Sequence, residues 1–171
     1  MKNIRLKEIF IILMTVGFMC SLLLTPAAAQ EKNKVKGKYY GVFTTMERHD
    51  IVGGDEGHKL SIYTHKGVDV INGGTYISEG TSDLINFNGS HAGYQNNIYK
   101  DGSYLASWQG KVKMTPAEKG GPPKISFEGT WSIIKGTGKY ENAEGKGTYK
   151  GMFIAADMIM METEGEIITK K

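Results

Sequence analysis

The sequence predicts an all-β fold, a single antiparallel barrel of eight or nine strands, from three observations. After residue 30, no window keeps apolar residues at helical spacing over three turns, and short runs instead alternate apolar and polar residues between turn residues. Glycine makes up 23 of the 171 residues, nearly twice its usual share of about 7%. In several of the alternating runs, glycine and large aromatic residues occupy the same face.

The first 29 residues have the three parts of a secretory signal peptide. A basic segment precedes an almost unbroken apolar run over residues 9–24, and the small residues 27–29 form a cleavage site. We expect cleavage of residues 1–29 to leave Gln30 as the new N-terminus, and residues 30–171 to form one barrel domain. The mature protein would then be secreted or periplasmic, without stable membrane insertion.

An uncleaved membrane anchor and a lipoprotein are the alternatives to cleavage. The apolar run of about 16 residues is slightly short for a membrane span, and the cleavage site follows it directly. Cys20 lies inside the run, but the preceding Gly17-Phe18-Met19 lacks the Leu-small-small pattern of a lipoprotein signal. Cleavage therefore remains the expectation.

Charge and cysteine content exclude several classes of protein. Residues 30–171 carry 18 Lys and Arg against 17 Asp and Glu, and Arg48 is their only arginine. A nucleic-acid surface normally needs a basic patch with guanidinium groups, so we expect no nucleic-acid partner. The sole cysteine, Cys20, lies in the predicted signal peptide, which excludes a disulfide framework and cysteine-ligated metal sites in the mature protein. One basic cluster is interpreted as a solvated leader into the first strand rather than a site for an anionic surface: Lys32, Lys34, Lys36 and Lys38.

Nine runs are candidate strands, because they alternate apolar and polar residues or are rich in β-branched and aromatic residues. In chain order they are Lys36–Thr45, His58–Thr64, Val68–Ile71 with Thr75–Ile77, Asp83–Asn88, Gln95–Lys100, Ser103–Lys113, Lys124–Ile134, Gly145–Ala155 and Asp157–Ile168. No crossover helices separate them, so they predict an antiparallel barrel or sandwich.

Turn residues connect several of these runs. Asp101-Gly102 is the best hairpin signal and predicts a type I′ turn, which needs positive φ at both central residues. Gly73-Gly74 is a weaker hairpin signal, and Lys119–Pro123 is a loop. Ala155–Asp157 allows a tight turn between the last two strands.

The placement of the glycines favours a barrel over a sandwich. The interior of a small barrel tapers, so large and small residues must alternate to fill it, and glycine lets coiled strands bend. The aromatic residues that share a face with glycine either pack as a solid core or line a cavity, since eight strands hold side chains alone or one small ligand. The candidate lining residues are Tyr39, Phe43, Trp108, Phe127, Trp131 and Phe153.

The opposite faces of these strands do not suit an outer-membrane barrel. They carry charged residues where such a barrel needs an apolar band facing lipid: Lys111, Lys113, Lys124 and Glu128.

A glycine-rich segment, Ile133–Tyr149, reads IIKGTGKYENAEGKGTY and predicts a structural turn. Gly136 and Gly138 would permit positive φ around Thr137, Ala143 is small enough to pack beneath the turn, and Gly145 would restart the next strand. A phosphate cradle is the competing interpretation, but it needs a helix after the loop, whereas a strand is predicted there.

This segment resembles a pattern shared by plant allene oxide cyclases, dirigent proteins and related bacterial barrel proteins, of the form I-x-G-G-T-G-x-[YF]-x-x-A-x-G. Lys135 stands where the family usually has the first of two glycines. The resemblance implies an eight-stranded antiparallel barrel with an apolar lumen. The family includes a cyclase that acts on a fatty-acid epoxide and proteins that steer phenoxy-radical coupling, but no catalytic residue of either activity matches a position in this chain.

Three other groups of residues receive structural interpretations. Six residues that lie close together in the sequence could offer oxygen or nitrogen ligands to a metal: His49, Asp50, Asp55, Glu56, His58 and His65. Their spacing matches no known ligand pattern, so the interpretation as a solvated loop is favoured. Met158, Met160 and Met161 are interpreted as packing residues rather than copper ligands, because they divide between two strand faces. Glu162, Glu164 and Glu166 share one face and are interpreted as a wet outer surface rather than acid–base catalysts.

The sequence thus predicts a barrel that binds a small apolar or aromatic molecule in its lumen, with no chemistry, metal or cofactor assigned. Two alternatives remain open. One is an isomerase or cyclase acting on a hydrophobic substrate in the barrel, and the other is a non-enzymatic envelope protein whose barrel is filled. The sequence does not predict the oligomeric state.

Overall fold

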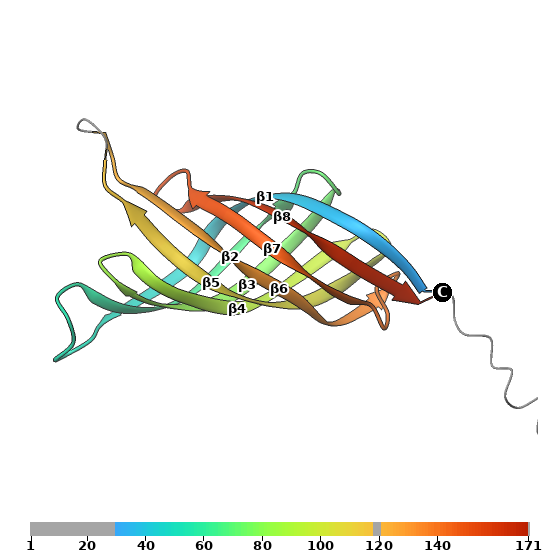
Figure 1. Cartoon of the computed structure of the whole chain (residues 1–171), viewed down its shortest axis with the longest axis horizontal. Coiled ribbons are helices and arrows are strands. Elements are labelled where there is room, and N and C mark those ends of the chain that lie inside the picture. Colours follow the sequence, from blue (N-terminus) through green and yellow to red (C-terminus); the bar gives the residue numbers. More distant parts are fainter. Residues whose placement is uncertain (1–29, 118–120, 171) are drawn as a thin grey trace, which may run out of the picture.

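The computed structural model describes residues 30–117 and 121–170. The predicted signal peptide, residues 1–29, and part of the predicted loop Lys119–Pro123 lie outside these residues. Eight strands make up the fold (Figure 1): β1 (Gln30–Asp50), β2 (His58–Asp69), β3 (Gly74–Ile85), β4 (Asn88–Tyr99), β5 (Gly102–Thr115), β6 (Lys124–Gly138), β7 (Glu144–Phe153) and β8 (Met158–Lys170).

The eight strands close into a barrel. Each strand pairs antiparallel with the next one in the chain, and β8 pairs with β1 to complete the ring. The predicted all-β class and single antiparallel barrel are therefore confirmed, with eight strands. None of the described residues belongs to a helix that is long and apolar enough to cross a membrane.

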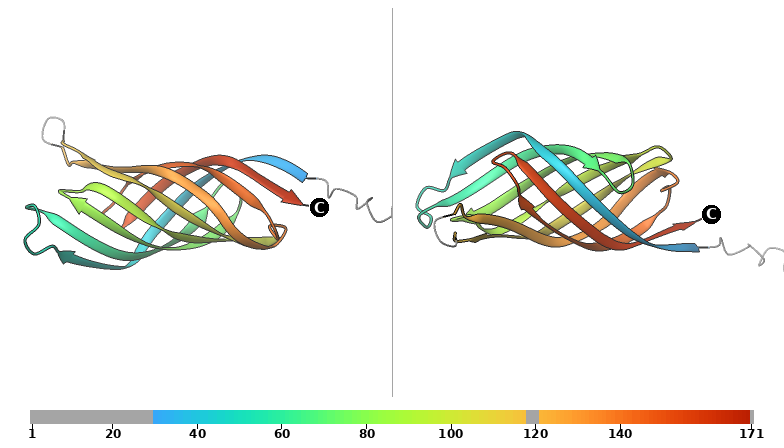
Figure 2. Two further views of the ribbon diagram at one scale, coloured as in Figure 1. Left: turned by 60° about the horizontal axis from the view of Figure 1, so that its bottom comes forward. Right: turned by 90° about the horizontal axis from the view of Figure 1, so that it is seen from above.

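The barrel is elongated and its two ends differ (Figures 1 and 2). The "loop end" carries the connections at residues 51–57, 86–87 and 154–157, together with the described residues 116–117 and 121–123 between β5 and β6. The "terminal end" carries the connections at residues 70–73, 100–101 and 139–143, together with the first residues of β1 and the last residues of β8.

β1 is longer than the predicted strand Lys36–Thr45, because it begins at Gln30 and ends at Asp50. The basic cluster that we interpreted as a leader therefore lies within β1. Lys32 pairs with Ile168 of β8 in the ladder, and its ammonium group forms an ion pair with Glu166 at 2.8 Å. The alternating lysines therefore lie on the solvated face of β1, and the pairing of this part of β1 with β8 closes the barrel.

A β-bulge between Phe43 and Thr45 changes the direction of the side chains that follow. One extra residue in a strand exchanges its inner and outer faces. Phe43 faces the lumen before the bulge, and Met46 and Arg48 line the lumen after it. The bulge thus places the only arginine of residues 30–171 on the inner side of the loop end.

β3 contains Thr75–Ile77, which the sequence predicts together with Val68–Ile71, and residues 83–85 of the predicted strand Asp83–Asn88. Val68 and Asp69 instead end β2, and residues 86–87 form a turn. Between the two parts of β3, the inner face is formed by Ser78, Gly80 and Ser82, all of which are buried. Buried and exposed residues keep alternating there, but the buried ones are small and not apolar, so the sequence does not reveal the alternation. This continuity is the reason that the barrel has eight strands and not nine.

The type I′ hairpin conformation occurs at a different turn from the predicted one. The predicted hairpin is present, because β4 and β5 pair antiparallel on either side of residues 100–101. The predicted type I′ turn is wrong, because neither Lys100 nor Asp101 has positive φ and Gly102, with φ 150°, is the first residue of β5. The two-residue turn with positive φ at both positions is Asn86-Phe87, with φ 50° and 61°. A phenylalanine gives no sequence signal for this conformation, because bulky residues rarely adopt it.

The buried core follows the inner face of the barrel in two parts. The larger cluster consists of Tyr39, Tyr76, Val112, Phe127, Tyr149, Ile159 and Met161. A smaller cluster lies at the terminal end and consists of Tyr104, Ala106, Ala143 and Ile167.

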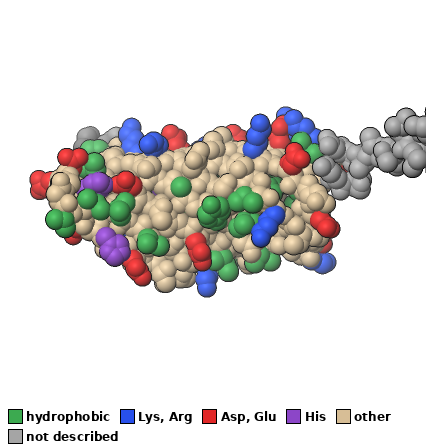
Figure 3. Space-filling model, turned by 90° about the horizontal axis from the view of Figure 1, so that it is seen from below, with side chains coloured by type: hydrophobic (Ala, Val, Ile, Leu, Met, Phe, Trp, Pro, Cys, Tyr) green, Lys and Arg blue, Asp and Glu red, His purple; other side chains and the backbone are tan. Residues whose placement is uncertain are grey.

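The outer face mixes charged and apolar side chains. Figure 3 shows one side of the barrel, on which acidic and basic groups are interspersed with apolar ones. Glu162 and Glu164 are exposed to solvent, and Glu162 forms an ion pair with Lys150 at 3.8 Å. The interpretation of Glu162, Glu164 and Glu166 as a wet outer surface is therefore confirmed. Met158 and Met160 also face outward, whereas Met161 is buried in the lumen.

Candidate functional site

A cavity of about 950 Å³ runs through the lumen. Side chains from the inner faces of all eight strands line it, and exposed residues at both ends, such as Phe87 and Asp101, border it. The barrel is therefore not filled by its own side chains. This volume is within the range of about 300–1,000 Å³ that small-molecule sites occupy.

The structure places all six predicted lining residues around this cavity: Tyr39, Phe43, Trp108, Phe127, Trp131 and Phe153. The rings of Phe43 and Phe153 are stacked, with centroids 5.5 Å apart and planes 4° apart. Phe127 meets Phe153 edge to face at 6.2 Å. The sequence thus predicted their position, while their binding of a ligand stays a prediction.

Four large aromatic side chains lie against the barrel wall over pairs of glycines. Trp108 on β5 is the cross-strand partner of Gly93 on β4, which in turn is the partner of Gly80 on β3. A Cβ added to Gly93 would lie 2.5 Å from Cζ2 of Trp108, and one added to Gly80 would lie 2.5 Å from Cη2. The indole therefore fills the space that side chains at positions 80 and 93 would otherwise occupy.

The same arrangement occurs in three other rows of the barrel. In each row, an aromatic residue is followed across the ladder by two glycines whose missing side chains its ring replaces. The rows are Tyr76 over Gly67 and Gly41, Tyr149 over Gly129 and Gly110, and Trp131 over Gly147 and Gly165. Because these rings lie along the wall and not across the axis, the glycines keep the centre of the lumen open.

Sequence reasoning missed several residues of the lumen: Tyr63, His65, Tyr76 and His91. His65 was assigned to an exposed, charged loop, but β2 continues past Thr64 to Asp69 and places its imidazole in the lumen with 6% exposure. Burial alternates from Ser61 through Asp69 in the structure, but most of the buried residues there are polar, so the sequence carries no apolar signal for this part of β2.

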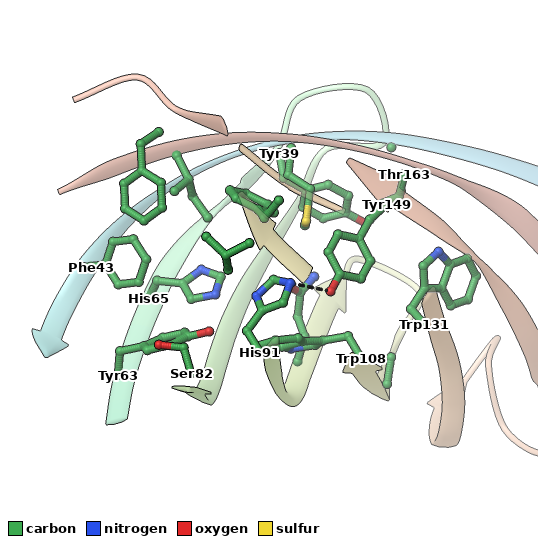
Figure 4. A pocket seen from close by; sticks show the side chains of 18 of the residues that line it. Tyr39, Phe43, Tyr63, His65, Ser82, His91, Trp108, Trp131, Tyr149 and Thr163 are labelled. Atoms are coloured by element: carbon green, nitrogen blue, oxygen red, sulfur yellow. Dashed lines mark hydrogen bonds between the residues drawn. The ribbon is translucent and has the colours of Figure 1, made fainter. Parts of the chain in front are cut away.

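Two histidines face the cavity and each contacts a tyrosine hydroxyl (Figure 4). The Tyr149 hydroxyl lies 2.9 Å from Nε2 of His91, and the Tyr76 hydroxyl lies 3.2 Å from Nδ1 of His65. Burial and, to a smaller extent, the nearby His91 lower the pKa of His65 to about 4. Burial also lowers the pKa of His91 to about 4, against the opposing effect of the Glu128 carbonyl. Both imidazoles are therefore neutral at pH 7.

A carboxylate and three tyrosines narrow the cavity at the terminal end. Asp69 is 2% exposed, and its oxygens accept hydrogen bonds from Asn72 Nδ2 at 2.7 Å and from the Tyr99 hydroxyl at 3.1 Å. The Tyr99 hydroxyl also lies 3.2 Å from that of Tyr39. Burial raises the pKa of both phenols, so they remain protonated and able to donate. Tyr104 completes this group by stacking on Tyr99 with centroids 6.0 Å apart.

The predicted turn motif has the expected role with one correction. Gly138 has φ 58°, and Ala143 is buried in the smaller core cluster. Gly136 is not among the glycines with positive φ; instead it has no room for a side chain, because the Tyr140 backbone lies against it. Thr137 contributes a hydroxyl that lies 2.9 Å from that of Ser103. Gly145 lies in β7, opposite Ile167.

The residues considered as metal ligands do not assemble. His58 contacts Asp83 at 2.6 Å, Asp50 pairs with Lys59, and His65 lies apart from them in the lumen. Among the described residues, no three His, Cys, Asp or Glu side chains are grouped so that they could hold a metal ion.

These features define a class of protein: a closed eight-stranded antiparallel barrel with an aromatic lumen that is open to small molecules. No protein-family model and no curated protein matches the chain in sequence.

Solved structures with a similar fold have been found for several proteins. A pterocarpan synthase dirigent protein has a TM-score of 0.49 and 10% identity, over 83% of this chain and 87% of that chain. An exo-specific intermolecular Diels-Alderase has a TM-score of 0.48 and 11% identity, over 80% and 98%. Pyocyanin demethylase has a TM-score of 0.43 and 16% identity, over 76% and 99%. These similarities are distant and concern the fold alone.

Proposed function

We propose that this protein binds one small, predominantly apolar or aromatic molecule in the lumen of its barrel. The observation that carries the proposal is the open cavity of about 950 Å³, which the glycine pairs maintain by holding Trp108, Trp131 and two tyrosines against the wall. An aromatic lining of this kind would gain free energy by releasing water from both the rings and an apolar ligand.

The two tryptophans of the chain provide the readout, because Trp108 and Trp131 both line the cavity. Titration with neutral aromatic and aliphatic compounds is expected to change the tryptophan emission for ligands that enter the lumen. The Trp108→Phe variant leaves Trp131 as the reporter and shows how deep in the barrel the ligand lies.

A pair of neighbouring residues on β3 offers a matched control. Ser82 is buried and lines the cavity, whereas Thr81 is exposed on the outer face. Ser82→Phe fills part of the lumen and is expected to weaken binding at least about tenfold, while Thr81→Phe leaves it unchanged. The proposal would be overturned if no compound changed the emission, or if both variants bound equally well.

We also propose that the mature protein is secreted or periplasmic after cleavage following Ala29. The support is the order of a basic segment, an apolar run and a small-residue cleavage site within residues 1–29. Expression of the full chain followed by mass spectrometry of the exported protein tests it. An N-terminus at Gln30 is expected, and retention of the intact chain in the membrane would contradict the proposal.

The two neutral imidazoles favour a second candidate function, proton transfer to and from a bound molecule. An imidazole that is neutral at pH 7 can act as a general base, and a tyrosine hydroxyl contacts each ring. The test is exchange of the α-protons of 2-tetralone in D₂O, followed by NMR. An isomerase-type activity predicts faster exchange with the protein than with its His65→Gln/His91→Gln variant, and equal rates would exclude it.

A further inference from the structure

The part of the lumen wall formed by β2 and β3 is polar, as is the inner face of the neighbouring β4, which carries Gln95 and Asn97. Ser61 and Ser82 are direct cross-strand partners, and each is 7% exposed. Tyr63 is the next inner-face residue of β2 and is 8% exposed. All three line the cavity, and Figure 4 shows Tyr63 and Ser82 projecting into it beside His65.

The hydroxyl groups of these three residues have no hydrogen-bond partner among the described residues. Their neighbour Ser78 shows the contrast: its Oγ donates to the Tyr94 carbonyl at 3.1 Å and accepts from Nε1 of Trp108 at 3.1 Å. No polar side-chain atom of the described residues is both sealed from solvent and unpartnered, so the three free hydroxyls are open to the cavity. Three hydroxyls on one wall that bond no protein group are therefore free to bond a polar group of a ligand in the cavity.

His65 adds a fourth polar atom to this wall. Its Nδ1 contacts the Tyr76 hydroxyl at 3.2 Å, whereas its Nε2 has no hydrogen-bond partner among the described residues. The His65 and Tyr63 rings lie 6.1 Å apart between centroids. The wall therefore presents three hydroxyls and one imidazole nitrogen, all of them neutral near pH 7.

We propose that Ser61, Tyr63 and Ser82 form a subsite that donates hydrogen bonds to a neutral carbonyl oxygen of an otherwise apolar, ring-containing ligand. This inference rests on the proposed function and specifies the ligand class for the same lumen. The hydroxyls hold the oxygen, and the aromatic walls around Trp108 and Phe127 hold the rings. A ligand bound in this way has one fixed orientation, because the polar residues Gln95 and Asn97 on β4 already bond each other at 2.8 Å.

The charges near the subsite favour a neutral oxygen over a carboxylate. Lys59 lines the cavity, but its ammonium group is paired with Asp50. Arg48 is the cross-strand partner of Ser61 and also lines the cavity, but its side chain is exposed to solvent. A carboxylate at the buried hydroxyls would lose its hydration without gaining a buried cation, which is costly.

Three compounds that share one ring system and differ only at carbon 9 test the proposal: fluorene, 9-fluorenone and fluorene-9-carboxylate. Tryptophan emission and calorimetry give their dissociation constants with the complete mature chain. We expect 9-fluorenone to bind about tenfold more tightly than fluorene, the effect of one to two added hydrogen bonds. We expect fluorene-9-carboxylate to bind more weakly than 9-fluorenone.

Variants locate the preference for the ketone. Tyr63→Phe and the double variant Ser61→Ala/Ser82→Ala are each expected to reduce the ratio of the two dissociation constants to about threefold or less. The matched control is Ser107→Ala/Ser132→Ala, because these two serines are also cross-strand partners but contact each other outside the lumen at 3.1 Å. The control is expected to keep the full preference.

The outcomes separate the subsite from the proposed function. Equal binding of fluorene and 9-fluorenone, or a preference that survives in both subsite variants, overturns the subsite and leaves lumen binding intact. Tighter binding of the carboxylate that is lost in Arg48→Gln also overturns it, in favour of an anion site. Absence of binding by both neutral ligands overturns the proposed function and the subsite together.

Discussion

Trp108 lies against Gly93, its direct cross-strand partner, with indole Cζ2 2.5 Å from the position that a Cβ of Gly93 would take. The ring extends over a second strand to Gly80, and its Nε1 donates to Ser78 at 3.1 Å. The backbone of two glycines thus provides the surface for an indole, and a hydrogen bond fixes its orientation. Three further rows of the barrel repeat the arrangement, and it explains how an eight-stranded barrel rich in large aromatics keeps a cavity.

Gly80→Ala is expected to push Trp108 from the wall into the lumen. The new Cβ would meet Cη2 and Cζ2 of the indole, and overpacking of this kind costs about 1–3 kcal/mol. We expect a lower free energy of unfolding in urea, a shifted Trp108 emission maximum and weaker ligand binding. Thr81→Ala, the adjacent change on the outer face, serves as the control. Unchanged emission and binding in Gly80→Ala would show that the glycine pair does not position the ring.

Stability is expected to fall as the pH falls from 6.5 towards 4, because His65 and His91 are buried in neutral form with pKa values of about 4. In this window, the unfolded chain binds protons that the folded barrel does not, so protons favour unfolding. Above pH 6.5 the free energy of unfolding is not reduced in this way, and near pH 4 the reduction reaches about 3 kcal/mol for each histidine.

Urea unfolding at several pH values measures this dependence. His65→Gln and His91→Gln are each expected to reduce the loss of stability between pH 6.5 and 4, whereas His49→Gln on the exposed part of β1 leaves it unchanged. An identical pH dependence in all four proteins would mean that the lumen histidines do not remain neutral on folding.

Asp69→Ala is expected to destabilise the terminal end strongly. The Asp69 carboxylate accepts from the backbone NH groups of Ile71 and Asn72 as well as from Tyr99 and the Asn72 side chain. Its removal leaves several donors unpaired in a buried place, at a cost of about 3 kcal/mol or more. Asp69→Asn keeps one acceptor oxygen and should lose less. Thermal unfolding compares the three proteins, and equal melting temperatures would contradict the assignment.

Phe87→Gly is expected to stabilise the barrel by roughly 0.5–1 kcal/mol, because Phe87 has φ 61° in the Asn86-Phe87 turn and glycine adopts this conformation without strain. Asn86 keeps the side-chain hydrogen bond from its Nδ2 to the Glu56 carbonyl. Phe87→Ala removes the ring but not the strain, so it separates the two effects in urea unfolding. Lower stability in Phe87→Gly than in Phe87→Ala would contradict the strain at this position, and lower stability in both variants than in the unchanged protein would show that ring contacts outweigh it.

Much of the fold could be predicted because alternation records which face of a strand is buried. The inner faces of β5, β6 and β7 were predicted residue by residue, including Trp108, Trp131 and Phe153. β3 was divided into two strands because Ser78, Gly80 and Ser82 face inward without being apolar. The bulge after Phe43 could not be predicted either, and it decides that Arg48 lies at the lumen.

The sequence by itself determined the all-β class, the antiparallel barrel and the six aromatic lining residues, since these depend on local alternation and composition. Only the tertiary structure decided that His65, Tyr63, Ser61 and Ser82 share one wall, and that the aromatic rings lie over glycine pairs. The register between strands controls both features, and a register shift of one residue would separate every such pair. The cavity therefore depends on cross-strand partners that are distant in the chain.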